Sequence, residues 1–207
     1  MGKEKYQREI ELLLKKSPVV SFSSLERIIR KQKKVKQYQK QLIRNSILKG
    51  KLKALAKGYY TAYDNPSLSV FCFKPGYLGL QDALSFHNLW EQETIPIIIT
   101  SRKVRSGIRK IMGMNVLLRR IDKKYMFGVD YFQDGNFCFP YSDIEKTFID
   151  MVYFKEELSR EALKNLSRKL NKKKLNNYLK HYPESIKKRV LTLIHFKVTT
   201  NQKAFKP

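Results

Sequence analysis

The segment Ser23–Tyr63, SSLERIIRKQKKVKQYQKQLIRNSILKGKLKALAKGYYTAY, decides the fold expected for the N-terminal part of this 207-residue chain. Ser23 and Ser24 precede apolar residues at helical spacing, which predicts a short helix that begins with a serine cap. After a basic turn, a second helix is expected over about Val35–Lys49. Gly50 ends this helix, because glycine adopts a positive φ at little cost.

Two short strands are predicted directly after this second helix. Lys51–Leu55 and Tyr59–Tyr63 alternate well enough for strands, and residues 56–58 form a short turn between them. A further amphipathic helix precedes the segment, with one apolar face made by Tyr6, Ile10, Leu13 and Leu14. Helices followed by a two-stranded ribbon are typical of a winged helix-turn-helix, a module that places one helix in the major groove of DNA.

The second helix of the segment divides into an apolar face and a polar face. The apolar residues, expected to pack against the preceding helices, are Val35, Tyr38, Leu42, Ile43 and Ile47. The outward side is shared by Lys36, Gln37, Gln39, Lys40, Gln41 and Arg44. Glutamine bonds an adenine edge in two places, whereas arginine and lysine favour guanine or phosphate. The alternative is a solvated charged face with no ligand.

The predicted DNA contacts combine this helix with the ribbon. They are Lys34, Lys36, Gln37, Lys40, Gln41, Arg44, Lys51, Lys53, Lys57 and Tyr60. The N-terminal half of such a helix reads bases, so Lys36, Gln37 and Lys40 are the main candidates for base recognition. The lysines of the ribbon are expected along the phosphates.

The formal net charge is +25 and is concentrated at the two ends of the chain. Residues 1–65 carry 17 Lys and Arg against 5 Asp and Glu, residues 66–154 carry 11 against 9, and residues 155–207 carry 15 against 4. Such a charge favours a polyanionic partner, which is DNA, RNA or an anionic membrane surface, with nucleic acid preferred. The basic C-terminal end either extends a DNA footprint, masks an acidic or nucleic-acid-bearing partner, or is a solvated surface.

Cysteine usage and hydropathy predict a cytoplasmic protein without a membrane partner. Cys72 and Cys138 are far apart and form no CxxC pair, which argues against both a disulfide framework and a zinc site. Acids interrupt the apolar run at the N-terminus, so no secretory signal is expected. The longest apolar run, Ile95–Ile99, is far shorter than the roughly 20 residues of a membrane span.

The predicted fold class is α+β, with two domains that meet at the turn signal Asn65-Pro66. Residues 1–65 form the winged helix and residues 66–207 the second domain, of which 66–154 are an α+β core and 155–197 a basic helical tail. The expected strands, which form a small and largely antiparallel sheet, are Ile95–Thr100, Met114–Arg119, Tyr125–Tyr131 and Phe137–Phe139. Ser101–Met112 is expected to be a loop or a short helix. Ser142–Phe154 and two or three stretches of the tail have helical periodicity.

Three stretches in order resemble the AbiEi family of antitoxins. LKGKLKALAKGYYTA is similar to the family pattern G-x-L-x-x-x-x-x-G-x-Y. YLGLQDALSFHNLWEQETIPIIIT, residues 77–100, resembles Y-[IL]-S-x-x-x-AL-x-x-H-x-L followed by P-x-x-x-x-x-T. SDIEKTFIDMVYF resembles the EK[AT]-x-x-D helix. The chain departs from the pattern at Gly79, where serine is frequent, at Asn88, where glycine is frequent, and in its very basic tail.

The resemblance implies a transcriptional repressor that binds an operator and autoregulates a toxin–antitoxin operon of the phage-defence type. It also implies a second domain that counters a nucleotidyltransferase-like toxin without forming a tight complex. The operator is expected to be an inverted repeat in double-stranded DNA, occupied by two molecules. Neither a catalytic site nor a cofactor is expected.

Two other functions remain open from the residues. A magnesium-dependent nuclease would use carboxylates and a lysine from the set Asp122, Asp130, Asp143, Glu145, Lys146 and Asp150. The alternative is that Glu145, Lys146 and Asp150 form local salt bridges on one helix. The other function is that of a basic RNA-binding protein. Metal sites need clustered ligands, and the three histidines are not clustered in the sequence, so no metal site is predicted. His87 is expected to form a hydrogen bond at a helix end.

Overall fold

The computed structural model describes residues 5–30 and 36–202, with side chains described over 8–27 and 40–194. Within these residues, no helix combines the length and the apolar character that crossing a membrane requires. The chain divides into two compact units, one made of residues 1–74 and 108–116 and the other of residues 75–107 and 117–207. The first unit thus continues past the predicted boundary at Asn65-Pro66.

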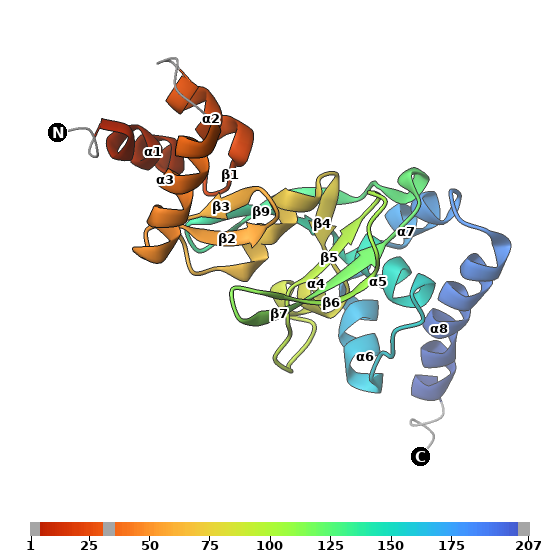
Figure 1. Ribbon diagram of the computed structural model, residues 1–207. Coiled ribbons are helices and arrows are strands. Elements are labelled where there is room, and N and C mark those ends of the chain that lie inside the picture. Colours follow the sequence, from red (N-terminus) through yellow and green to blue (C-terminus); the bar gives the residue numbers. More distant parts are fainter. Residues whose placement is uncertain (1–4, 31–35, 203–207) are drawn as a thin grey trace. The chain divides into compact units, whose positions relative to one another are not determined.

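The first unit begins with helices and a small sheet (Figure 1). Its elements are α1 (Lys5–Lys16), β1 (Val20–Ser21), α2 (Phe22–Arg30), α3 (Lys36–Leu48), β2 (Lys53–Ala56) and β3 (Tyr59–Thr61). The strands pair antiparallel in the order β1-β3-β2. Their core consists of Ile10, Leu14, Val20, Leu25, Ile43 and Leu52.

Hydrogen bonds and backbone conformation explain where these elements begin and end. Two details differ from the prediction: which serine caps α2, and the burial of Ile47. The serine that caps α2 is Ser21, whose Oγ accepts a hydrogen bond from the backbone N–H of Ser24 at 3.1 Å, and not Ser23 or Ser24. Gly50 has a φ of 69° and ends α3 as predicted. Ile47 was expected in the core, but 38% of it is exposed because it lies in the last turn of α3. Val35 lies outside the described residues, as does the side chain of Tyr38.

The apolar stretch after Asn65 forms the 3₁₀ helix η1 (Pro66–Phe73), which also belongs to the first unit. The Asn65 side chain accepts a hydrogen bond from the Ser67 backbone N–H at 2.9 Å and so caps this helix. Leu68, Val70 and Cys72 are buried. This hydrophobic content explains why the turn signal at Asn65 does not end the unit.

The larger sheet has six strands and is mixed, which corrects the prediction of a small, largely antiparallel sheet. Its strands are β4 (Gly76–Leu78), β5 (Ile97–Thr100), β6 (Gly107–Ile111), β7 (Met114–Arg120), β8 (Val129–Asp134) and β9 (Phe137–Ser142). The spatial order is β6-β7-β5-β4-β9-β8. Strands β4 and β9 pair parallel, as do β5 and β7, whereas β4 with β5 and β8 with β9 are antiparallel. The α+β fold class is confirmed.

The helices of the second unit are arranged around one of their number, α5. They are α4 (Leu80–Phe86), η2 (Lys123–Tyr125), α5 (Ile144–Tyr153), α6 (Arg160–Lys169), α7 (Lys172–Leu179) and α8 (Glu184–Gln202). Helix α5 contacts α4, α6, α7 and α8, and α6 runs beside α8 (Figure 1). The prediction of two or three tail helices is therefore confirmed.

Two segments of the middle differ from their predictions. Ser101–Met112 was expected to be a loop or a short helix, but it contains strand β6, whose basic residues gave no strand pattern. Tyr125–Tyr131 was expected to be one strand, but η2 ends at Tyr125 and β8 begins only at Val129. Gly128, with a φ of 65°, separates the two elements.

Candidate nucleic-acid interface

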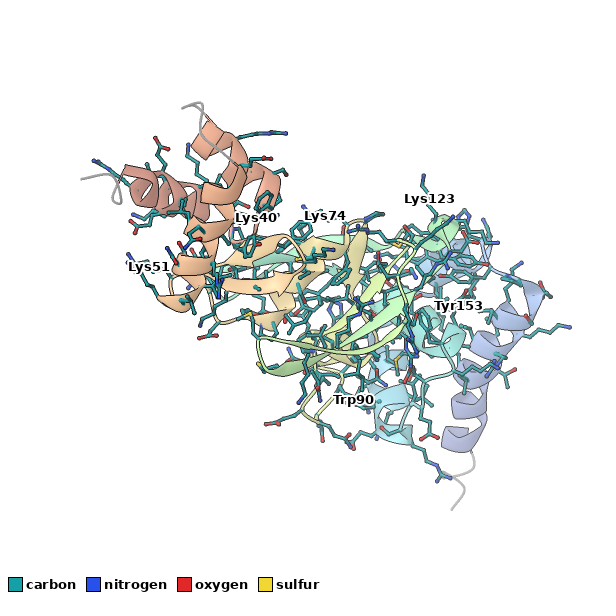
Figure 2. All side chains as sticks on the ribbon, in the orientation of Figure 1. Lys40, Lys51, Lys74, Trp90, Lys123 and Tyr153 are labelled. Carbon is teal, nitrogen blue, oxygen red and sulfur yellow. The ribbon has the colours of Figure 1, made fainter. Side chains whose placement is uncertain are left out.

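Helix α3 has one buried face and one basic face. Ile43 is almost fully buried in the core of the first unit and Leu42 packs beside it. Lys40, Gln41 and Arg44 are exposed (Figure 2 labels Lys40). Residues 40 and 44 share a face because they are one helical turn apart. The described part of the exposed face therefore has the composition that the sequence predicted.

The charge of this face is not balanced by nearby acids along the chain. No Asp or Glu occurs between Glu26 and Asp64. Within the residues that the structure describes, Lys40, Arg44, Lys51 and Lys57 form no ion pair with a carboxylate. A group of cations without internal counter-ions attracts anionic ligands.

The hairpin β2–β3 supplies the second part of the basic surface. The chain reverses after α3 because the backbone N–H groups of Lys51 and Leu52 both donate to the Ser46 carbonyl, at 2.9 and 3.2 Å. Lys51 is exposed before the hairpin and Lys57 at its turn (Lys51 is labelled in Figure 2). Gly58, with a φ of 79°, allows the tight turn.

Two predicted contacts of the hairpin already have partners within the protein. The Lys53 ammonium forms an ion pair with the Asp64 carboxylate. Tyr60 is half-buried, packs against the core of the first unit, and pairs with Val20 and Ala54 across the sheet. A structural role thus accounts for Tyr60 in the hairpin.

Three other predicted contacts are described only in part or not at all. Lys34 lies outside the described residues. Lys36 and Gln37 occupy the first turn of α3, but their side chains lie outside the described side chains. The described part of the interface therefore comprises Lys40, Gln41, Arg44, Lys51 and Lys57.

The carboxylates considered for a nuclease all lie in the second unit. Asp122 caps η2, Asp130 is exposed on β8, and Asp143 caps α5. Glu145 accepts a hydrogen bond from the Asn171 backbone N–H at 2.8 Å and lies 3.4 Å from the Lys174 ammonium. Over the described residues, no group of three or more His, Cys, Asp or Glu side chains could hold a metal ion.

Lys146 and Asp150 form an ion pair that is completely buried, one turn apart on α5. The Tyr77 hydroxyl donates to the second oxygen of Asp150 at 2.7 Å. The Lys146 ammonium also lies 5.3 Å from the ring centre of Tyr77, 5.7 Å from that of Phe127 and 5.9 Å from that of Tyr182. Burial lowers the pKa of Lys146 and raises the pKa of Asp150, while their mutual attraction opposes both shifts. Of the local salt bridges considered for Glu145, Lys146 and Asp150, the one between Lys146 and Asp150 is confirmed, whereas Glu145 lies near Lys174 of α7.

Asp143 connects the segment around the buried Lys146–Asp150 ion pair to helix α7. Its carboxylate accepts hydrogen bonds from the Lys146 backbone N–H at 2.7 Å and the Tyr178 hydroxyl at 2.8 Å, and the Lys174 ammonium lies 3.1 Å away. Burial and the hydrogen bond to Asp143 raise the pKa of Tyr178 to about 12. The acids and the lysine of the EKT-x-x-D stretch thus hold helices together.

Asp82 has a shifted pKa that the sequence reasoning did not identify. It lies in the first turn of α4 and accepts a hydrogen bond from the Ile97 backbone N–H at 3.0 Å. Burial raises its pKa to about 7, which this hydrogen bond opposes and the charge of Asp134 reinforces. Both the burial and the nearness of Asp134 arise only when the chain folds, so no local motif could have signalled the shift.

His87 has the role expected for it. It is the C-cap of α4, and its Nε2 lies 2.8 Å from the Ser142 carbonyl oxygen. Phe86, its neighbour, stacks on Tyr141 with ring centres 4.2 Å apart. The AL-x-x-H-x-L stretch therefore joins α4 to the end of β9.

Comparisons with known proteins identify a similar fold but do not assign the chain to a protein family. No family model matches the chain, and no curated protein matches it. Among solved structures, the chain is similar to the crystal structure of the Rv2827c protein from Mycobacterium tuberculosis, with a TM-score of 0.59 and 13% sequence identity. The match covers 92% of this chain and 76% of that one. At this identity the likeness extends to the fold alone.

Proposed function

We propose that the first unit is a winged helix-turn-helix that binds operator DNA and represses transcription. The observation that carries the proposal is the acid-free segment between Glu26 and Asp64, which places unpaired cations on α3 and on the adjacent hairpin. The element order α1-β1-α2-α3-β2-β3 and the sheet order β1-β3-β2 fit this module. Helix α3 would enter the major groove, and Lys51 and Lys57 would contact phosphates.

The wider proposal is an AbiEi-type antitoxin that autoregulates its operon and counters a nucleotidyltransferase-like toxin without a tight complex. Asn88 supports the resemblance, because its φ of 55° is the conformation that glycine favours, and glycine is frequent there in the family. The glycine at position 79 also has a physical reason. A Cβ there would lie 2.6 Å from the Ile99 Cδ1 atom, so a serine would require Ile99 to move.

The experiment compares binding of the full chain to the DNA upstream of its own gene, to unrelated DNA and to structured RNA at one salt concentration. Binding that is at least tenfold tighter to the upstream DNA is expected. Lys40→Ala should weaken this specific binding by about 1–3 kcal/mol if Lys40 contacts a base, and should weaken binding to unrelated DNA less. Lys57→Ala should weaken both equally, since phosphates carry no sequence information.

Lys15→Ala is the matched control, because it removes the same charge from α1, outside the proposed interface. It should leave the preference for upstream DNA unchanged. Equal affinity for upstream DNA and RNA would favour the basic RNA-binding protein. Cleavage of DNA with Mg²⁺ that is lost in Asp130→Ala would favour the nuclease.

A further inference from the structure

A cavity of about 420 Å³ lies in the second unit, where the end of α5, the following segment, α6 and α8 meet. Its volume is within the range of small-molecule sites. At the roughly 30 Å³ that a water molecule occupies in the liquid, this space corresponds to about 14 heavy atoms. The cavity is thus suited to a small ligand.

The apolar part of the lining is aliphatic. It is formed by Val152, Leu158, Leu163 and Leu193. Val152 is buried in the main core, and the three leucines pack against that core. None of the described side chains that line the cavity is aromatic, so these walls offer no stacking surface for a nucleotide base. An alkyl chain fits these walls better than a planar ring does.

The polar part of the lining is cationic. Lys155, Lys188 and Arg189 line the cavity, are exposed, and form no ion pair with a carboxylate over the described residues. Glu156, the one acid of the lining, is already engaged. Its Oε1 accepts a hydrogen bond from Arg119 at 2.6 Å and its Oε2 accepts one from Gln81 at 3.2 Å. The cavity therefore presents uncompensated positive charge beside an aliphatic wall.

The backbone at Lys155 gives a second, independent observation. Lys155 has a φ of 59°, in the left-handed region where helices usually end with glycine. The helix end is otherwise regular, since Lys155 N–H donates to Val152 O at 3.2 Å and Glu156 N–H donates to Met151 O at 2.9 Å. A lysine at this position is less favourable for the backbone than glycine, so its side chain is the feature to be explained.

We propose that this cavity binds a small amphipathic anion, an alkyl chain of about ten carbons that carries a phosphate group. The chain lies against Leu158, Leu163 and Leu193, and the phosphate is held by Lys155, Lys188 and Arg189 through charge-assisted hydrogen bonds. The site lies in the second unit and does not depend on DNA binding by the first.

The test is isothermal titration of the full chain with decyl phosphate, below its critical micelle concentration. We expect saturable binding of one molecule per chain. Inorganic phosphate and decanol, which each supply one half of the ligand, should bind at least tenfold more weakly. A lack of saturable binding, or equal affinity for either half, would overturn the proposal.

Variants connect the binding to this cavity. Lys155→Gly removes a cation while placing the preferred residue at the positive φ, so it should weaken decyl phosphate at least fivefold without lowering the melting temperature. Arg189→Gln should weaken it by a similar factor. Lys187→Gln is the control, because it removes the same charge from the same helix at a residue that pairs with Glu184 instead. Unchanged affinity in both Lys155→Gly and Arg189→Gln, or an equal loss in Lys187→Gln, would contradict the site.

Discussion

At the scale of single residues, the most unusual feature is a lysine and an aspartate that are both excluded from water. An ion pair buried in this way contributes little net stability, because desolvating both charges offsets their attraction. It does, however, make each partner dependent on the other. The Tyr77 hydroxyl also donates a hydrogen bond to the Asp150 carboxylate, so the three side chains form one buried cluster.

Lys146→Met should therefore destabilise the protein by about 3–5 kcal/mol, because Asp150 would stay buried without its counter-ion. The double variant Lys146→Met with Asp150→Leu should lose less than the single variant does, since no lone charge remains. Urea unfolding followed by circular dichroism measures both. A single variant within about 1 kcal/mol of the parent would show that the pair is not coupled in this way.

Asp82 should make stability depend on pH in an unusual direction. Its pKa is about 7 in the folded chain, whereas an unfolded aspartate has a pKa of about 3.9, so the folded state binds more protons between these values. The stabilising effect of the protonated form is complete below about pH 4 and is lost as the pH rises to 7. Each pH unit in this window costs up to about 1.4 kcal/mol.

Unfolding free energies at pH 5 and pH 8 test this expectation. The parent should lose about 2–3 kcal/mol more than Asp82→Asn over this interval, because asparagine keeps an acceptor for the Ile97 N–H but does not ionise. Equal pH dependence in the two proteins would mean that Asp82 is ionised in the fold at pH 5.

At the scale of secondary-structure elements, the sequence identified those whose residues carry their own pattern. The apolar, β-branched run Ile95–Thr100 contains strand β5. The Asp134-Gly135 turn signal lies where β8 and β9 are joined, and the two turn residues are Gly135 and Asn136. Strand β6 was missed because GIRKI is basic and owes its extended shape to pairing with β7. The parallel pairing of β4 with β9 joins segments far apart in the chain, and no local pattern records it.

The same limit applies to the candidate interface. Spacing along α3 placed Lys40 and Arg44 on the exposed side, because helical periodicity depends only on the local sequence. The ion pair of Lys53 with Asp64 and the inward position of Tyr60 depend on how the hairpin folds back. Sequence composition alone could not separate these residues from Lys51 and Lys57.

Gly128 lies close to side chains of both α5 and α7. A Cβ there would lie 2.8 Å from the Tyr178 Cε2 atom and 2.9 Å from the Lys146 Cβ atom, and the φ of 65° already disfavours other residues. Gly128→Ala should therefore cost about 2–4 kcal/mol of unfolding free energy, from backbone strain together with overpacking. Gly135→Ala is the matched control, with a φ of 57° and open space around it, and should cost only about 1 kcal/mol. Equal losses would assign the whole effect to backbone strain.

At the scale of the whole molecule, two basic ends flank a nearly neutral middle. If the first unit alone contacts DNA, the effect of removing a cation on DNA binding should depend on where that cation lies in the chain and not on the total charge. The first unit has the exposed cations Lys40, Arg44, Lys51 and Lys57, and the second unit has exposed counterparts in Lys164, Lys172, Lys173 and Lys180.

The dependence of the association constant on salt separates these two groups of cations. Changing the four residues of the first unit to glutamine should reduce the slope of log K against log salt by about 3–4, because each lost phosphate contact removes about 0.9. The same change in the four lysines of the second unit should leave the slope within about 1 of the parent. An equal reduction in both variants would extend the DNA footprint to the tail.

The parallel pair of β4 and β9 also sets the order in which the chain can fold. Leu78 pairs with Tyr141, roughly sixty residues later, whereas β2 and β3 are joined by a tight turn. Contacts of such long range close slowly, because the intervening chain must lose entropy before they form. During synthesis, the three-stranded sheet has all its strands once Thr61 has left the ribosome. The six-stranded sheet must wait for β9, and until then the edge of β4 that β9 will occupy has no partner.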